Sequence, residues 1–321
     1  MPWTDLVPKD IDELYTILNR LADTQAYVFR GHASCHWPHL EPSLHRILGD
    51  KRTFDDSVMT ETTAIAAFRR HSRSLLQAAE LTYFDGILDS VTLMQHYGAP
   101  TRLLDWTLSP WVACYFATDG SDDDDASVWT FNQHELVKKN QRPEGARDFD
   151  RFRELTTVTT TETWFEAASE AGPYIDSFRY QYANAQMSAQ QSLFTIAGRL
   201  GDNHDEALAR TLDEPWQTLR IRIPRASKKL LRQRLFLMNV SALALFPTIN
   251  GVGRNIREAI LAEYALSDEA LLRALEEKAR GLGGGEDAGP GTGDADKGAR
   301  RSGRRPRRTA RRARTPRRGS S

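Results

Sequence analysis

The sequence of 321 residues is poor in several features that would define its class at once. It has only two cysteines, Cys35 and Cys114, which excludes a disulfide framework and is typical of a reducing compartment. No apolar run approaches the ~20 residues of a transmembrane helix, so we expect no membrane partner. The N-terminal segment is acidic and lacks the apolar stretch of a signal peptide. Together, these absences predict a cytoplasmic protein.

Two further absences limit the fold. No glycine-rich phosphate loop follows a predicted strand, and strands and helices do not alternate regularly, which argues against a doubly wound nucleotide-binding fold. No self-similarity at roughly 20–50 residues is visible, so we do not predict a solenoid. Short strands and amphipathic helices alternate irregularly instead. We therefore predict an α+β fold with a mixed or mostly antiparallel sheet.

The charges sum to zero but are unevenly distributed. Residues 281–321 hold eleven Arg and one Lys against four acidic residues, a net charge of +8, and the rest of the chain carries −8. The composition of this segment, mostly Gly, Ala, Pro, Arg and Thr, cannot bury a core. We therefore expect an α+β domain over residues 1–280 and a disordered basic tail over 281–321. Residues 300–321 are expected to bind nucleic acid by charge, without sequence specificity.

Periodicity and turn residues locate the expected elements. Serine before proline at 109–110 is the clearest helix start, because Ser109 can cap the open N–H groups and Pro110 loses no hydrogen bond there. The apolar residues WVACYFAT that follow predict a buried helix. Other helices are expected at 10–21, 60–78, 85–97, 227–240, 253–264 and 267–280, and strands at 26–30, 127–131, 191–198 and 219–223.

Residues 93–117, LMQHYGAPTRLLDWTLSPWVACYFA, hold the greatest variety of polar side chains in the chain. Arginine presents a planar fork to carboxylate or phosphate, and tryptophan and tyrosine present faces on which a ring can stack. We expect Asp105 and Thr107 to orient the arginine or a sugar hydroxyl. This mixture, set between two apolar helices, predicts a pocket. In the structural alternative, Arg102 and Asp105 form a buried ion pair and the tryptophans belong to the core.

These residues resemble the FRG-domain family, which is named for an aromatic-Arg-Gly motif, here residues 29–31. A second block, residues 95–98 and 100–107, matches the family closely and is highly specific. The resemblance extends over roughly residues 26–260. Gln186 stands where the family usually has arginine, and Ser192 where it usually has glycine. Further positions match along the chain, some of them more weakly: Trp37, Leu40, Pro42, Ser43 and Arg46, then Ser127 to Trp129, Gln190 to Thr195, and Leu245 to Pro247 with Gly251.

A more distant similarity is to ADP-ribosyltransferase folds, in the order of three motifs. They are Arg30 at a strand end, then Thr107 and Ser109 before an apolar helix, and then Gln190-Gln191. The similarity implies a site for NAD in which Arg30 holds the pyrophosphate or ribose. Gln190 stands at the place where such folds carry a glutamate. The catalytic candidates are therefore Arg30, Thr107 and Gln190, and NAD is a possible cofactor, whereas Ser109 has an alternative role as a helix cap.

From the motifs we predict a pocket for a small anionic ligand such as a nucleotide, in which several arginines face one water-accessible hollow. The competing hypothesis is a non-catalytic interaction module that its basic tail tethers to nucleic acid. There the same residues would form a buried network. The predicted ligand-binding residues are Arg30, Gly31, Arg46, Gln95, His96, Tyr97, Arg102, Asp105 and Trp106.

A cluster of nitrogen and sulfur groups follows the first predicted strand. His32, Cys35, His36 and His39 lie within eight residues of one another. Zinc sites usually place two ligand pairs well apart, and Pro38 restricts this loop. We therefore predict no metal site.

Overall fold

The computed structural model describes residues 3–49, 53–81, 84–120, 122–141, 146–180, 184–266 and 276. The chain divides into one compact unit, Met1–Ala265, and a second, Leu266–Ser321. The second unit lies almost wholly outside the described residues. The same is true of the predicted helix at 267–280, the predicted domain end at residue 280 and the basic tail.

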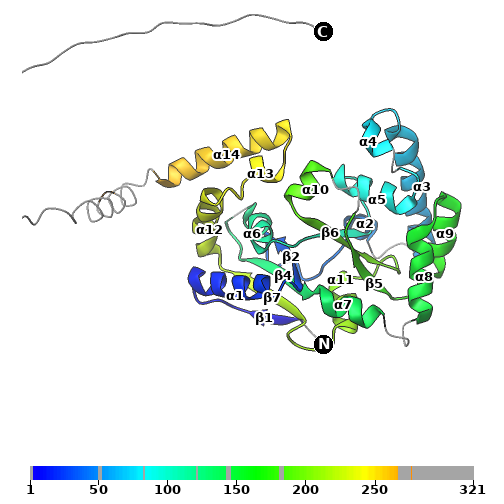
Figure 1. Ribbon diagram of the computed structural model, residues 1–321, viewed down its shortest axis with the longest axis horizontal. Helices are drawn as coiled ribbons and strands as arrows, with labels where there is room; N and C mark the ends of the chain where they lie inside the picture. Colours follow the sequence, from blue (N-terminus) through cyan, green and yellow to red (C-terminus); the bar gives the residue numbers. More distant parts are fainter. Residues whose placement is uncertain are drawn as a thin grey trace, which may run out of the picture. The chain divides into compact units, whose positions relative to one another are not determined.

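The first unit is an α+β domain built on one mixed seven-stranded sheet, as predicted (Figure 1). The strand order is β1-β7-β4-β2-β3-β6-β5. Only the edge pair of β1 and β7 is parallel in the described sheet, and the other neighbours run antiparallel. The strands are β1 (Thr4–Leu6), β2 (Tyr27–His32), β3 (Leu103–Thr107), β4 (Ala126–Asn132), β5 (Ile175–Phe178), β6 (Ser192–Ala197) and β7 (Thr218–Ile223).

Helices cover both faces of the sheet in three core clusters. On one face, α1 (Ile11–Asp23), α6 (Pro110–Thr118), α12 (Arg225–Leu237) and α13 (Ala242–Leu245) pack on β2, β4 and β7. Beside them, α3 (Phe54–Ser72), α5 (Ile87–His96) and α9 (Thr161–Glu170) pack toward β6. The opposite face is covered by α7 (Gln133–Asn140) and α11 (His204–Thr211). The remaining helices are α2 (Ser43–Leu48), α4 (Ala78–Leu81), α8 (Ala146–Thr157), α10 (Ala185–Ala189) and α14 (Ile249–Leu266).

Helix α6 confirms the sequence prediction and lies directly on β2. Its N-terminus is capped by Ser109, whose hydroxyl accepts from the Val112 N–H at 3.4 Å. A Cβ atom at Gly31 would lie 2.1 Å from the carbonyl oxygen of Ala113 on α6. Only glycine leaves room for this approach, so the glycine of the first motif is a packing requirement.

Sequence patterns placed some elements incorrectly or missed them. The segment that becomes β3 was not among the predicted strands. It is a strand with Leu103 and Leu104 buried on opposite faces, so it shows no alternation of polar and apolar residues. The helix predicted at 60–78 begins earlier, at Phe54, because Thr53 caps it by accepting from the Asp56 N–H at 3.2 Å.

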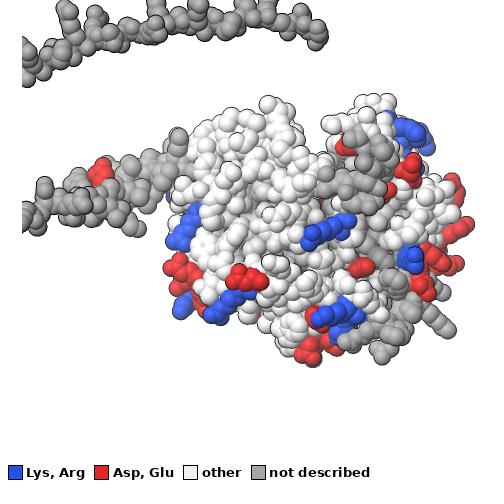
Figure 2. Space-filling view, viewed as in Figure 1, with Lys and Arg blue, Asp and Glu red and all other residues white. Residues whose placement is uncertain are grey.

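The surface of the described domain carries both signs of charge. On the face shown in Figure 2, basic and acidic side chains are interspersed, and the area over α13 and α14 shows no charged side chains. Exposed apolar side chains on α14 include Ile249 and Ile256. Within the described residues, the helices are too short or too polar to cross a bilayer.

Candidate functional site

The central sheet is incompletely paired between β2 and β3. Strand β2 pairs with β4 from Tyr27 to His32, but its register with β3 consists of the single pair Phe29 and Thr107. Beyond this pair the two strands separate. A cavity of about 430 Å³ lies at this split. We call it the β2–β3 cavity.

The β2–β3 cavity draws its walls from segments far apart in the sequence. Strand β3 and the end of α5 supply four of the polar side chains, while the loop after β2, α6 and the end of α13 supply aromatic rings. The lining residues are Phe29, Arg30, Gly31, Ala33, Trp37, Gln95, His96, Asp105, Trp106, Thr107, Phe116, Asp119, Gln186, Met187, Gln190, Ser192, Phe194 and Phe246.

Arg30 reaches across the split from β2. Its Nη1 donates to the backbone carbonyl of Asp105 at 2.8 Å, where a fully paired sheet would have a backbone bond, and its Nε donates to His32 Nε2 at 3.3 Å. Burial lowers the pKa of the Arg30 guanidinium, and the charge of Asp105 opposes this. Arginine nevertheless stays protonated in proteins, so Arg30 brings a fixed positive charge to the cavity.

Asp105 is held in place by a chain of polar side chains. The Thr101 hydroxyl donates to Gln95 Oε1 at 2.5 Å, and Gln95 Nε2 donates to Asp105 Oδ2 at 2.6 Å. Because the threonine proton goes to the amide oxygen, the amide NH2 must face the carboxylate. The exposed Asp105 carboxylate is thus oriented at the cavity, where it can accept from a hydroxyl or pair with a cation.

Two histidines beside the cavity are uncharged near neutral pH. Burial lowers the pKa of His96, which lines the cavity. Burial and the nearby Arg30 charge lower the pKa of His32 to about 3. A neutral His32 ring can accept the Arg30 N–H, so it supports the guanidinium without competing with it for an anion.

One side of the cavity is aromatic. Trp37 is 55% exposed, and the rings of Phe116 and Phe246 meet edge to face with their centroids 6.1 Å apart. Arg254 lies over the Phe246 ring at 4.6 Å, and its Nη2 donates to Asp119 at 3.2 Å. Aromatic walls opposite polar groups are typical of sites for planar rings.

Comparison with known families identifies the first part of the domain. Residues 25–126 match the FRG domain. The chain contains an FRG domain. The matched range runs from β2 through β3 and α6 to the beginning of β4, and it includes Arg30, Gln95 and Asp105. No curated protein and no solved structure matches the chain.

Several lining residues lie outside the matched FRG range. Gln186, Met187 and Gln190 come from α10 and its C-terminal end, and Phe246 follows α13. The sequence prediction did not place Phe246, Phe116 or Asp119 at the site. The sequence did contain a signal for Phe246, namely the weaker family match at residues 245–247 with Gly251. In the structure these two residues pack closely, since a Cβ at Gly251 would lie 1.8 Å from the Phe246 carbonyl oxygen.

Thr107 and Gln190 lie in the cavity but do not hold the arginine. The Thr107 hydroxyl donates to the Gln190 carbonyl at 2.7 Å and accepts from the Ser109 N–H at 3.0 Å. The Gln190 side-chain amide donates to the Leu245 carbonyl at 3.1 Å. The first bond fastens β3 to the turn between α10 and β6, and the bond to Leu245 joins that turn to α13. Arg30 is oriented instead by His32 and by the Asp105 carbonyl.

Arg102 does not line the β2–β3 cavity. Its side chain is 1% exposed and forms a bidentate ion pair with Glu61, in which Nε lies 2.6 Å from Oε1. The guanidinium also donates to the Gly198 carbonyl at 2.9 Å and stacks over Trp164. Arg102 therefore forms a buried ion pair, as in the structural alternative considered from the sequence, but its partner is Glu61 on α3 rather than Asp105.

The other predicted ligand residues divide between the cavity and the surface. Trp106 forms part of the cavity floor, is 2% exposed and donates through Nε1 to Thr195 at 2.9 Å. Arg46 is exposed, donates to the Glu41 carbonyl at 2.6 Å and does not line the cavity. Tyr97 is 53% exposed and lies outside the lining, with its hydroxyl 2.7 Å from Glu80. Gly31, Gln95 and His96 line the cavity.

The four metal-like residues after β2 are engaged separately. His32 accepts from Arg30, His36 lies 3.4 Å from Asp124, and His39 lies 3.1 Å from Asp205. Cys35 is a free thiol. Among the described residues, no group of three or more metal-ligating side chains is present.

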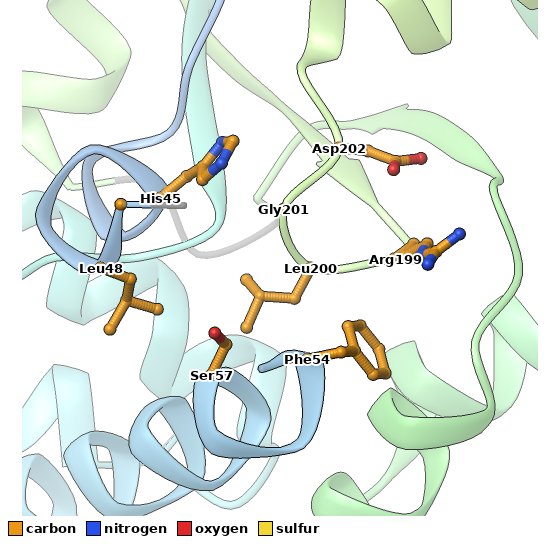
Figure 3. A pocket seen from close by; sticks show the side chains of 9 residues that line it. His45, Leu48, Phe54, Ser57, Arg199, Leu200, Gly201 and Asp202 are labelled. Atoms are coloured by element: carbon orange, nitrogen blue, oxygen red, sulfur yellow. The ribbon is translucent and has the colours of Figure 1, made fainter. Parts of the chain in front are cut away.

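A second cavity, of about 260 Å³, lies between α2, the start of α3 and the turn after β6. Figure 3 shows Phe54 and Ser57 of α3 pointing toward the loop that carries Arg199 and Leu200. Arg199 lies over the Phe54 ring at 5.7 Å. None of the predicted ligand residues lines this cavity, so the β2–β3 cavity is the candidate site.

Proposed function

We propose that the FRG domain binds a small nucleotide-class ligand in the β2–β3 cavity, with Arg30 holding its anionic group. The observation that carries the proposal is the position of the Arg30 guanidinium, which bridges the split strands at the cavity through the Asp105 carbonyl. Two of its five N–H groups are used in the bonds to Asp105 and His32. The remaining N–H groups are suited to phosphate or carboxylate oxygens.

The rest of the lining supports a nucleotide rather than a simple anion. The Asp105 carboxylate, fixed by Gln95, suits the hydroxyls of a ribose, and Trp37 and Phe246 suit a base. Gln186 and Gln190 add neutral hydrogen-bonding groups at the other side. The proposal places the protein in the cytoplasm, where nucleotides are plentiful and thiols such as Cys35 stay reduced.

The proposal is one of binding, not of a particular reaction. NAD belongs to the ligand class, and ADP-ribosyl transfer would need an anionic group beside the reacting ribose. Gln190, at the third motif, is uncharged and its amide bonds to the Leu245 carbonyl. The carboxylates that line the described cavity are Asp105 and Asp119. The interaction-module alternative depends on the tail, which lies outside the described residues.

The test is isothermal titration calorimetry of the full chain with nucleotides, NAD and ADP-ribose, in the wild type and in Arg30→Ala. We expect binding of at least one of these ligands in the wild type and a loss of ten-fold or more in Arg30→Ala. Arg210→Ala is the matched control, because Arg210 pairs with Asp202 at 2.9 Å and does not line the cavity. Equal binding by wild type and Arg30→Ala would contradict the proposal.

A further inference from the structure

The charged groups at the β2–β3 cavity are few and mostly negative. Arg30 is the one Lys or Arg among the described residues that line it, against the carboxylates of Asp105 and Asp119. Arg102, which the sequence placed beside Arg30, is sealed in its pair with Glu61. This inventory offers one positive charge to a ligand.

From this inventory we infer that the ligand is a nucleoside 5′-monophosphate, in preference to di- and triphosphates and to dinucleotides. The inference rests on the proposed function and narrows it. A single phosphate is matched by the Arg30 fork. Each further phosphate would add negative charge next to Asp105 or Asp119 with no second lining cation to compensate it.

The placement of Arg30 and Asp105 fits a phosphate joined to a ribose. Arg30 Nη1 bonds to the backbone carbonyl of the same residue whose carboxylate Gln95 orients. The phosphate site and the hydroxyl acceptor are therefore neighbours, as the 5′-phosphate and the ribose hydroxyls are in a mononucleotide. A carboxylate accepts hydrogen bonds from ribose hydroxyls and repels phosphate. Asp105 therefore sets the orientation of the ligand, with the ribose at Asp105 and the phosphate at Arg30.

Arg254 does not alter this count of charges. Its guanidinium lies over the Phe246 ring of the aromatic wall and donates to Asp119. The pair neutralises Asp119 in part and leaves Asp105 as the free negative partner of Arg30. The aromatic wall then remains available to the base, which carries no charge at neutral pH.

The experiment is calorimetry of the full chain with AMP, GMP, CMP and UMP, each compared with its di- and triphosphate, together with NAD. The arginine-rich tail attracts polyphosphates by charge alone. For each ligand we therefore compare the dissociation constant of Arg30→Ala with that of the wild type, and call their quotient the Arg30-dependent ratio. The tail is the same in both proteins, so its contribution to binding cancels in this ratio. We expect a monophosphate to show the largest ratio, about ten-fold or more above its triphosphate.

Two further variants guard against misfolding of Arg30→Ala. Arg30→Lys keeps the charge but loses the fork, and we expect it to weaken the monophosphate less than alanine does. Asp105→Asn should weaken a nucleoside monophosphate several-fold but should not weaken inorganic phosphate, because the carboxylate that is lost repels phosphate. If the Arg30-dependent ratio grows with the number of phosphates or is largest for NAD, the inference is overturned and the proposed function survives. If no ligand shows an Arg30-dependent ratio, both are overturned.

Discussion

Arg30 and Arg102 lie in the same domain but in different surroundings. Arg102 is closed off by Glu61, the Gly198 carbonyl and the Trp164 ring. Arg30 has N–H groups that can donate to a ligand in the cavity, and it bonds to the backbone carbonyl of Asp105 rather than to the Asp105 carboxylate. The first arrangement satisfies a buried charge completely, and the second leaves one available to a ligand.

The Arg102–Glu61 pair is expected to contribute to stability and not to binding. Glu61→Ala removes one partner and leaves the Arg102 charge buried, which typically costs about 3–5 kcal/mol. Urea unfolding of the variant should show this loss in the free energy of unfolding. The exposed pair of Arg210 is the control, and Arg210→Ala should cost less than about 1 kcal/mol. A loss as small as this in Glu61→Ala would contradict the assigned role of the pair.

Gly31 gives a second prediction at this scale. Gly31→Ala would push a methyl group to within 2.1 Å of the Ala113 carbonyl, so β2 and α6 would have to separate. Overpacking of this kind costs about 1–3 kcal/mol or more, measurable as a lower midpoint of thermal unfolding. Gly253→Ala, in α14, is the matched control because its Cβ would meet no atom within 4 Å. It should stabilise by up to ~1 kcal/mol.

At the scale of elements, one carboxylate of α14 joins the segment that contains α13 and α14 to α6. Glu258 Oε1 accepts from the Tyr115 hydroxyl at 2.6 Å, and Oε2 accepts from the Ala242 N–H at 2.9 Å. Burial and Glu258 both raise the pKa of Tyr115, which therefore remains a donor at all ordinary pH values. This attachment keeps Phe246 at the cavity wall.

Glu258→Ala should loosen this segment and leave the sheet intact. Hydrogen exchange is expected to rise at residues 241–260, including the Ala242 amide, and to stay unchanged in β2 and β4. Nucleotide affinity should fall several-fold because Phe246 is less well placed. Arg257→Ala, one residue away and exposed, is the control. Unchanged exchange at 241–260 in Glu258→Ala would show that other contacts hold the segment.

Elements with local signals were predictable from the sequence. The cap of α1 is one example, since Asp10 accepts from the Glu13 N–H at 2.8 Å, and the αL glycine after α5, Gly98 with φ +79°, is another. The strand β3 was not predictable in this way. It lies between β2 and β6 and is buried on both faces, so its identity depends on strands that are distant in the sequence.

For the candidate site, the motifs located the residues but not their partners. Arg30, Gln95 and Asp105 were named from the sequence and lie together at the cavity. Whether an arginine faces a cavity or a carboxylate is decided by tertiary contacts. Arg102 illustrates this, because its partner Glu61 lies on a helix whose pattern gave no sign of a buried charge.

At the scale of the whole molecule, stability should fall on acidification. Burial lowers the pKa of both His32 and His204 to about 3, against 6.5 for an unperturbed histidine. Between these values the unfolded chain binds protons that the native domain does not, so stability is fully present above pH 6.5 and is lost as the pH falls toward 3. Each histidine contributes a slope of up to about 1.4 kcal/mol per pH unit.

Chemical denaturation at a series of pH values from 4 to 7 measures this slope. His204→Gln should reduce this slope by up to the contribution of one histidine, about 1.4 kcal/mol per pH unit, whatever the substitution does to stability at pH 7. His71, an exposed histidine, supplies the control, and His71→Gln should leave the slope as in the wild type. A slope that is the same in wild type and His204→Gln would show that the native domain protonates His204 as readily as the unfolded chain does.

The most direct test of the account is whether a nucleotide occupies the β2–β3 cavity. Side-chain N–H signals in ¹H–¹⁵N NMR of the full chain, titrated with the tightest-binding nucleotide, report on this. We predict saturable shifts of Arg30 Nε–H and of the Trp37 indole, and none of the Trp216 indole, which is 48% exposed but outside the cavity. Shifts confined to arginines of the tail, with Arg30 and Trp37 unchanged at saturation, would contradict it.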